Sequence, residues 1–386
     1  MRSNGASCAR LIVFSLRVKS VPKQPNQVLW VSKSLLRIST DVQESLGSAI
    51  FCLIYMRKTL TKRLLAGSLL LLPTPVIAQT PSSSKALIWS DPGDISSKNL
   101  LYGSGGEKDQ PRPPVVFEKE DTKGSNPKFD VHDQDGTKWK VKLGVEAKPE
   151  TVATRLLWAI GYFTEEDYLE PELKIDGVPK HLQRGRTLIK NGEARDARLK
   201  HHPKHAEKDD EWHWRKNPFS GTREFNGLRV MMSLINNWDV KDENNAIYED
   251  KQSGQRFYVV TDLGASFGSI GYRLGPGRGK GNLGAYKGSK FITHVHKDYV
   301  DFSSPAHSTV IGILGIFSIP NFATRMRLRW IGRHIPREDA KWVGGLLAQL
   351  KPAQIEDAFR SAGYSDKDIA EYSVVVEKRI AELGKL

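Results

Sequence analysis

Cysteine is nearly absent from this chain. Two of its 386 residues are cysteines, Cys8 and Cys52, and both precede Met56. A protein that begins at or after Met56 therefore has no disulfide framework, no thiolate metal site and no cysteine nucleophile.

Acidic residues are scarce in the first part of the chain. Residues 1–78 hold 11 Lys and Arg but only 2 Asp and Glu, which accounts for +9 of the formal charge of +14. The rest of the chain carries the remaining +5. Since so mild an excess is no footprint for binding a polyanion, we expect no nucleic acid among the partners.

The stretch that begins at Met56 has the parts of a secretory signal peptide in their usual order. A basic start at 57–63 precedes an apolar run at 64–72, which is short for a membrane span. Val76-Ile77-Ala78 then offers a cleavage site before Gln79. We therefore predict export to the periplasm or the cell exterior, with no stable membrane span after cleavage.

Residues 56–78 are thus the predicted signal peptide, and residues 1–55 do not belong in front of one. The simplest interpretation of 1–55 is a mis-assigned start or a leader extension. A transit peptide, favoured by the Ser- and Arg-rich, acid-poor composition, and an uncleaved membrane anchor are the alternatives.

Residues 79–113 are rich in Ser, Gly, Pro and charge, which predicts a linker or a loosely packed lead-in. The run Gly103-Ser104-Gly105-Gly106 is a conceivable phosphate loop. It precedes no clear strand–helix unit, so a linker is favoured.

Alternating apolar and polar residues on both sides of Gln134-Asp135-Gly136 predict a β-hairpin. Phe129 and Val131 must share a face with Trp139 and Val141, because a slip of one residue would separate them. This register requires a three-residue loop with Gly136 in the left-handed conformation.

The same register sets Lys128 opposite Lys142 and Asp130 opposite Lys140. Directly opposed lysines repel each other, and a bound phosphate would remove the conflict. Backbone N–H groups of Gly124-Ser125-Asn126 at the same end of the hairpin are placed to cradle an anion. The alternative is that both lysines point to solvent, but the polar pattern further along the chain favours phosphate binding.

Two further elements are predicted before that pattern. Pro149 is expected to open a helix that ends near Gly161, with one apolar face formed by Val152, Leu156, Ala159, Ile160 and Phe163. Residues 221–235 form a second helix, with Phe225, Leu228, Met232 and Ile235 on one face.

The charged region 164–215 between these helices reads as strands and loops. It contains four histidines near acidic residues 209–211: His201, His202, His205 and His213. Their spacing fits no zinc pattern, so a solvated loop is favoured over a metal site.

The stretch 236–264 carries the polar residues with the most specific spacing. Asp239 is followed by Lys241 at +2 and Asn244 at +5, then by a short hairpin, then by Asp262. Phosphoryl transfer needs a carboxylate near the attacking hydroxyl and two oxygen ligands that hold Mg²⁺ against the phosphates. A loop that supplies Asp239 and Asn244, with Asp262 at the end of the next strand, fits that requirement.

No Asp or Glu occurs from residue 263 to 297, where basic residues recur among many glycines: Arg273, Arg278, Lys280, Lys287, Lys290 and Lys297. We predict a flexible basic loop that receives an acidic substrate or closes over phosphates. A merely solvated loop is the alternative. The glycines at 275–284 are too irregular for a dinucleotide-binding fingerprint.

The remainder is predicted to be mainly helical. Three amphipathic helices are expected at 339–350, 353–362 and 365–383. Ser365 and Asp368 at the start of the last one resemble a capping box.

These residues resemble the protein-kinase-like superfamily, above all atypical members such as the HipA-type serine kinases and the secreted kinases. Asn237-Trp238-Asp239 followed by Asn244 is similar to the catalytic loop, and residues 124–128 are similar to the G-x-x-x-K phosphate loop. The resemblance covers about residues 120–300. Trp238 replaces the usual arginine before the aspartate, and Leu263 replaces the phenylalanine of D-F-G.

The resemblance implies a role for each residue of the transfer site. Asp239 would orient or deprotonate the acceptor hydroxyl, and Lys241 would neutralise charge on the moving phosphoryl group. Asn244 and Asp262 would ligate Mg²⁺.

The resemblance also implies a nucleotide site. Gly124 and Ser125 of the loop, with Lys128 and Lys142, would hold the phosphates of ATP. Glu150 would pair with Lys142, and Glu146 is the alternative partner. If neither pairs, Glu150 only complements the helix dipole.

The implied fold is α+β and two-lobed, with a small antiparallel sheet and one helix at 114–215 ahead of a mostly helical lobe at 216–386. The implied function is an exported ATP- and Mg²⁺-dependent phosphotransferase. Its acceptor would be a hydroxyl of a small molecule or a protein, with an acidic protein at the 263–297 loop as one candidate. The alternatives are a kinase-shaped binding module without catalysis, since ATP is scarce outside the cytoplasm, and an envelope protein in which the motif is a coincidence.

Overall fold

The computed structural model describes residues 86–122, 126–201, 206–269, 279–304 and 329–386. Every described residue belongs to one compact unit, Gln79–Leu386. The predicted leader and signal peptide, and the loop residues Gly124 and Ser125, lie outside the described residues. Among the described helices, none has the length and apolar character needed to cross a membrane.

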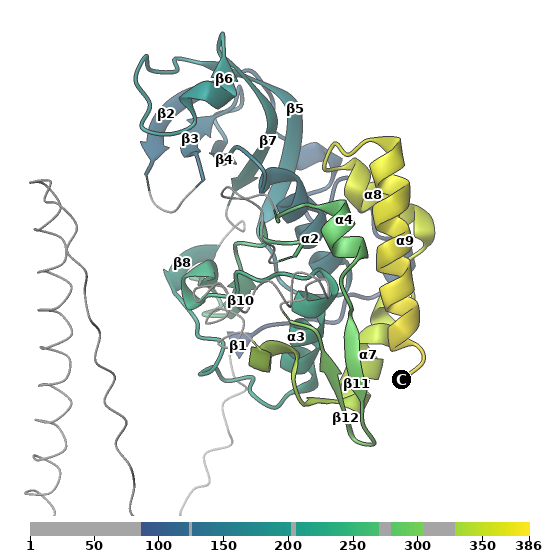
Figure 1. Cartoon of the computed structure of the whole chain (residues 1–386). Helices are drawn as coiled ribbons and strands as arrows, with labels where there is room; N and C mark the ends of the chain where they lie inside the picture. Colours follow the sequence, from purple (N-terminus) through teal and green to yellow (C-terminus); the bar gives the residue numbers. More distant parts are fainter. Residues whose placement is uncertain (1–85, 123–125, 202–205, 270–278, 305–328) are drawn as a thin grey trace, which may run out of the picture. The chain divides into compact units, whose positions relative to one another are not determined.

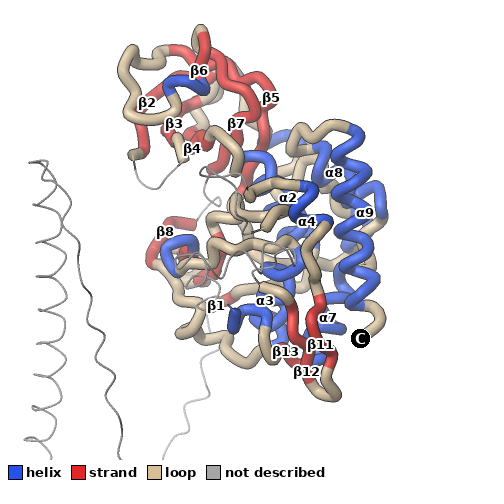
Figure 2. The backbone as a smooth tube through the Cα atoms, in the orientation of Figure 1, coloured by secondary structure: helices blue, strands red, loops and turns tan. Residues whose placement is uncertain are grey.

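The packed unit contains a sheet of six strands (Figures 1 and 2). Its strands are β2 (Val115–Asp121), β3 (Lys128–His132), β4 (Lys138–Lys142), β5 (Glu166–Asp176), β6 (Ile189–Lys190) and β7 (Glu193–His201), in the order β4-β3-β2-β5-β7-β6. Alternate side chains such as Val131, Val141 and Leu199 are fully buried and form a core inside the sheet.

This sheet departs from the small antiparallel sheet that we predicted. β4 also pairs with β7, which closes five strands into a ring, and β2 pairs with β5 in parallel. Alternation along one strand predicts which side chains point inward, but it does not say which distant strand closes the ring.

The first hairpin has the predicted register. Lys128 lies opposite Lys142 and Val131 opposite Trp139. Gly136 has a φ of 77°, and the Asp133 amide donates to the Thr137 carbonyl at 3.0 Å, which leaves the expected three-residue loop.

Helix α2 (Ala147–Ala159) begins two residues before the predicted start at Pro149. Proline is tolerated throughout the first turn, because those amides have no partner within the helix, so it does not fix the first residue. Val152, Leu156, Ala159 and Ile160 of the predicted apolar face are buried, whereas Phe163 lies beyond the end of the helix and is partly buried. Glu150 and Arg155 on the same helix are buried as well. A helix buried on nearly all sides must satisfy these charges inside the protein.

A second sheet has the order β1-β10-β9-β8. It consists of β1 (Ala86–Leu87), β8 (Ala206–Asp210), β9 (Asn245–Asp250) and β10 (Arg256–Val260), and the predicted hairpin is formed by β9 and β10. β1 pairs with β10 in parallel. The predicted regions 114–215 and 216–386 therefore both contribute to this sheet, because β8 belongs to the first region and pairs with β9 of the second.

The lead-in is packed where the structure describes it, rather than loosely tethered. Ile88, Ile95 and Leu100 are buried, the last two completely, in the cluster that includes the C-terminal helices. The segment also contains two short 3₁₀ helices, η1 (Ile95–Ser97) and η2 (Glu107–Asp109). Composition suggested a linker because apolar residues are few, yet three of them are buried and Ala86 and Trp89 pack against the same cluster.

The rest of the unit is mainly helical, as predicted. α3 (Arg223–Leu234), α7 (Arg337–Leu347), α8 (Pro352–Arg360) and α9 (Asp366–Leu383) pack together, and Ser365 caps α9 by accepting from the Asp368 amide. Short elements complete the described chain: η3 (Arg186–Leu188), η4 (Asp242–Asn244), α4 (Leu283–Lys287), β11 (Ile292–Val295), β12 (Tyr299–Phe302), η6 (Arg329–Gly332) and β13 (Ile335–Pro336).

The segment 263–297, predicted as a flexible basic loop, contains α4 and β11 and packs partly into the core where the structure describes it. Leu263 and Phe267 are buried, and Tyr286 of α4 is fully buried. Apolar residues spaced among the glycines supply this packing. Arg273 and Arg278 lie outside the described residues.

Candidate functional site

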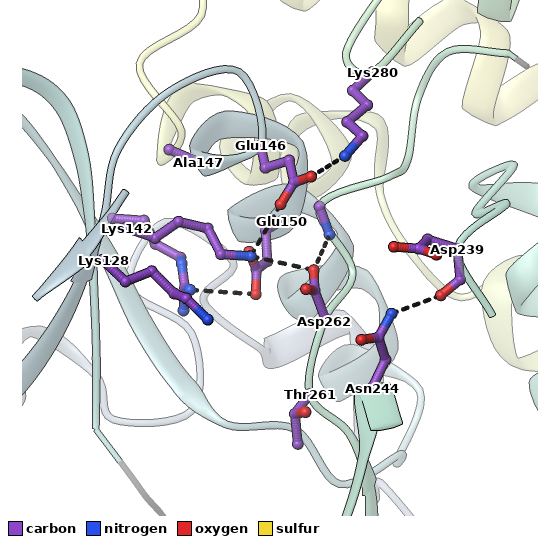
Figure 3. A network of polar contacts seen from close by, with 12 residues as sticks. Lys128, Lys142, Glu146, Ala147, Glu150, Asp239, Asn244, Thr261, Asp262 and Lys280 are labelled. Carbon is purple, nitrogen blue, oxygen red and sulfur yellow. Dashed lines mark hydrogen bonds and ion pairs between the residues drawn. The ribbon is translucent and has the colours of Figure 1, made fainter. Parts of the chain in front are cut away.

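Lys142 is the centre of the polar cluster in Figure 3. Its Nζ lies 2.7 Å from Glu150 Oε2, 3.1 Å from Glu146 Oε2 and 3.1 Å from Asp262 Oδ1. Lys142, Glu146 and Glu150 are each 3% exposed, whereas about a third of the Asp262 side chain, 35%, is accessible. Among the three acidic partners of Lys142, Asp262 is therefore the one whose side chain is accessible to solvent.

Three elements bring these residues together. Lys142 is the last residue of β4, and Val141 before it points into the barrel core. Lys142 therefore points outward, toward α2, because side chains alternate along a strand. Glu146 and Glu150 are four residues apart and share a helix face, and both predicted candidates contact the lysine.

Mutual attraction controls the charge of the cluster. Burial alone would lower the pKa of Lys142, but Glu150 and Asp262 raise it overall. Burial alone would raise the pKa of Asp262, but Lys142 lowers it well below the usual range. At neutral pH the cluster therefore contains an ammonium and an ionised, accessible carboxylate.

The predicted conflict between Lys128 and Lys142 is resolved by carboxylates. Lys142 is held by its three acidic partners, while the Lys128 Nζ lies 3.9 Å from Asp121 Oδ2. The hairpin register therefore does not by itself require a bound phosphate. Burial lowers the pKa of the half-buried Lys128, with Lys142 adding to the effect and Asp121 opposing it.

Asn244 and Asp262 are held close together by backbone pairing. Val260 lies opposite Asn245 in the β9–β10 ladder, and the Thr261 amide donates to the Asn244 carbonyl at 2.9 Å. Asp262 follows directly. Figure 3 shows Asp262 between the Lys142 cluster and the Asp239–Asn244 pair.

Asp239 is positioned by the same loop. The Asn244 Nδ2 donates to the Asp239 carbonyl at 2.7 Å, and the Asp239 amide donates to Asn237 Oδ1 at 3.0 Å. The Asp239 carboxylate forms an ion pair of 2.7 Å with Lys241, whose side chain is half exposed. The loop thus presents Asp239 and Lys241 as one unit at the surface.

The donor set suits a magnesium ion that is shared with a ligand. Asp262 offers an ionised carboxylate, and Asn244 offers an amide oxygen because its Nδ2 is bonded to Asp239. Within the described residues, no group of three or more His, Cys, Asp or Glu side chains forms a complete metal site. Mg²⁺ is commonly held by one or two carboxylates together with substrate phosphates, so the protein need not provide a full shell.

No protein-family model matches this chain, and no curated protein matches it. Among solved structures it is similar to the crystal structure of CtkA, a Helicobacter pylori proinflammatory kinase. The two share 12% identity over 70% of this chain and 95% of that chain, with a TM-score of 0.37. The likeness is weak and establishes no shared activity.

Sequence reasoning missed three cations around this site. Lys280 forms an ion pair with Glu146, and its Nζ lies 5.4 Å from the Trp238 ring centroid. Lys200 contacts Glu165 and donates to the Thr261 carbonyl at 3.3 Å. Arg198 lies against Glu150. Lys280 was noted only as part of a basic segment, and nothing near Lys200 or Arg198 in the sequence indicates a partner.

Two of the four histidines that were considered for a metal site contact acidic side chains. His201 contacts Glu166 at 3.1 Å and packs against Trp139, and His213 contacts Asp242 at 2.9 Å. His202 and His205 lie outside the described residues.

Proposed function

We propose that this protein binds Mg²⁺-ATP and transfers a phosphoryl group to a hydroxyl, in a two-lobed kinase-like fold. One observation carries the proposal: the ammonium of Lys142 and the carboxylate of Asp262 are in contact at 3.1 Å, and Asn244 is paired in backbone register beside Asp262. A cation for phosphates and two oxygen donors for a metal thus lie together, reached from the surface through Asp262.

Each residue has a distinct part in this proposal. Lys142, with Lys128 at the next strand, attracts the phosphates, while Glu150 keeps Lys142 in place. Asp262 and Asn244 hold Mg²⁺, which when bound neutralises charge on the phosphate oxygens. Gly124 and Ser125 belong to the proposed phosphate loop.

The acceptor side is assigned to the Asp239 loop. Asp239 accepts the proton of the incoming hydroxyl or orients it, and Lys241, already in contact with Asp239, stabilises negative charge on the group in transfer. We also propose, from the pattern of residues 56–78, that the protein works outside the cytoplasm.

A titration of the purified protein with Mg²⁺-ATP, followed by its melting temperature, tests this proposal. A ligand that binds only the folded state stabilises it by about 2.7 kcal/mol at 100 times its Kd. We expect a rise in the wild type, no rise in Asp262→Ala, and a normal rise in Asp176→Ala, which removes an exposed carboxylate at the end of β5.

Asp239→Ala separates binding from transfer. We expect this variant to keep the thermal shift and to lose transfer of labelled phosphate to an acceptor, because Asp239 is not proposed to hold the metal. Absence of any shift in the wild type at millimolar Mg²⁺-ATP would refute the proposal.

One observation favours a non-catalytic alternative. A lysine ammonium has three N–H donors, and in Lys142 all three have a carboxylate partner. A phosphate must therefore displace one of them. If none yields, the protein is a kinase-shaped binding module, and the basic segment 263–297 is the proposed contact for an acidic partner.

A further inference from the structure

Arg198 of β7 is fully buried beside the Lys142 cluster. It is 1% exposed, and it lies opposite Lys142 in the β4–β7 pairing. Its Nη2 is 3.4 Å from Glu150 Oε1, while Lys142 Nζ is 2.7 Å from Glu150 Oε2. One carboxylate therefore bridges two cations on neighbouring strands.

We propose that Arg198 is a positioning residue for the phosphate-binding lysine. It holds one oxygen of Glu150 and thereby directs the other oxygen onto Lys142. The proposal rests on the function proposed above and adds a residue to it that makes no contact with the nucleotide.

The bonding of Arg198 supports this role. A buried guanidinium costs several kcal/mol unless it is paired, and a well-packed apolar side chain often fills such a place with less cost. Among the described residues, Arg198 Nε and Nη1 have no hydrogen-bond partner, so the guanidinium is not kept for a rich set of structural bonds. Its close contact is the one with Glu150.

The position of Glu150 explains why two cations are needed. The helix fixes the Cα of Glu150, but rotation about its side-chain bonds would let the carboxylate turn toward either strand. Lys142 alone is drawn in three directions, by Glu146, Glu150 and Asp262. Arg198 removes this freedom because it fixes the second oxygen of the carboxylate.

Helix α2 also provides a matched control. Arg155, 2% exposed, donates from Nη2 to the Asp167 carbonyl at 2.7 Å, and its Nη1 lies 3.3 Å from Asp167 Oδ1. This is a second buried arginine–carboxylate pair between α2 and the barrel. Neither of its members contacts Lys142, and Asp167, whose charge also acts on Arg198, remains present in Arg155→Met. The pair therefore has the structural role without direct contact with the lysine.

The test compares Arg198→Met, Arg198→Lys and Arg155→Met with the wild type. Loss of a buried partner is expected to lower the melting temperature in both methionine variants. The Kd for Mg²⁺-ATP, measured by calorimetry below the melting transition, should rise about tenfold or more in Arg198→Met, which corresponds to about 1.4 kcal/mol. It should stay within about twofold in Arg155→Met, and Arg198→Lys should recover part of the loss because it restores a cation.

A second measurement does not depend on nucleotide binding. The rate at which acetic anhydride labels Lys142, relative to the exposed Lys108, is measured by mass spectrometry in the same variants. Lys142 is buried, so it should react slowly in the wild type and in Arg155→Met. It should react faster in Arg198→Met if Glu150 no longer holds it inside. The loss of the Arg198 charge alone would raise the pKa of Lys142 and slow the reaction, so a faster rate reports a change in the position of the lysine. This result would support the role of Arg198 even if the protein bound no ATP, in which case the proposed function alone would fail.

A double-mutant cycle with Glu150→Gln completes the test. If Arg198 acts through Glu150, then Arg198→Met should add little to labelling or Kd in the Glu150→Gln background. Equal effects of Arg198→Met and Arg155→Met, or an undiminished effect of Arg198→Met without Glu150, would overturn the proposal.

Discussion

At the scale of single residues, the buried cations around Lys142 differ in how many acidic partners they have. Lys142 has a carboxylate for each N–H, and Arg198, although equally buried, has one close partner. The lysine is therefore the anchor of several segments, and the arginine serves one contact. Substitution of Lys142 should therefore disturb several segments, whereas substitution of Arg198 should act through Glu150.

Asp301 on β12 offers a prediction about pH at this scale. Its carboxylate lies 2.7 Å from the Arg333 guanidinium and accepts from the His334 amide at 2.9 Å. Burial alone would raise the pKa of Asp301, but these two neighbours lower it overall. An acid whose pKa is lower in the folded state stabilises the fold above the unfolded pKa, and this contribution is lost as the pH falls through the folded pKa.

We therefore expect Asp301→Asn to destabilise the protein at pH 7 and to cost progressively less below about pH 4, near the unfolded value for Asp. Urea unfolding of the variant and the wild type across this range measures the difference. The exposed Asp176→Asn serves as the control at the same pH values. A cost that is equal at pH 7 and pH 3 would contradict the assignment.

At the scale of elements, the C-terminus of α2 depends on a glycine. Gly161 has a φ of 97°, and a Cβ there would lie 2.2 Å from the Ser90 carbonyl oxygen. The Ser90 amide donates to the Gly161 carbonyl at 3.0 Å, and the Trp89 indole donates to the Ile160 carbonyl at 2.7 Å. The end of the helix is therefore fixed to the lead-in segment by backbone contacts that leave no room for a side chain.

Gly161→Ala should destabilise the protein more than Gly221→Ala. Gly221 has a similar φ of 89° but no atom within 4 Å of its added Cβ, so it measures the conformational strain alone, about 1–2 kcal/mol. The clash with backbone at Gly161 adds to that amount because Ser90 must move. Chemical denaturation of the two variants gives the comparison, and equal costs would show that Ser90 yields freely.

The sequence predicts the individual helices and hairpins more completely than it predicts the contacts between distant elements. The register of β3 and β4 follows from Phe129 and Val131, since any other pairing would expose them. The proximity of Asn244 and Asp262 follows from the short hairpin between them. The pairing of β4 with β7 has no such local signal, so the place of Arg198 opposite Lys142 could not be predicted.

Two further features could not be predicted from the sequence: the first residue of α2 and the burial of the lead-in. Pro149 marks the first turn of a helix without marking its first residue, which is Ala147. The lead-in contains few apolar residues, and their burial depends on helices that come more than 200 residues later. The Gln354 side chain donates to the carbonyls of Ile95 at 2.9 Å and Lys98 at 2.7 Å.

At the scale of the whole packed unit, the lead-in therefore acts as part of the fold. We expect a protein that begins at Gln79 to unfold in one cooperative transition, and one that begins at Pro114 to be unstable or unfolded. Burial of Ile88, Ile95 and Leu100 contributes about 1.5–3 kcal/mol each, which together approaches the total stability of an ordinary domain. Thermal denaturation followed by circular dichroism distinguishes the two proteins, and equal melting temperatures would restore the linker interpretation.

The charges of the cluster around Lys142 have a consequence for which ligands can bind beside it. In the described residues, the cations Lys142, Arg198, Lys200 and Lys280 are each in contact with an acidic partner from the set Glu146, Glu150, Glu165 and Asp262. Four basic and four acidic side chains thus balance each other in number before any ligand arrives. A free triphosphate would upset that balance beside the accessible carboxylate of Asp262, whereas a triphosphate that brings its own divalent cation would upset it less. Under the proposed function, the cluster would thus discriminate against nucleotide that arrives without its metal.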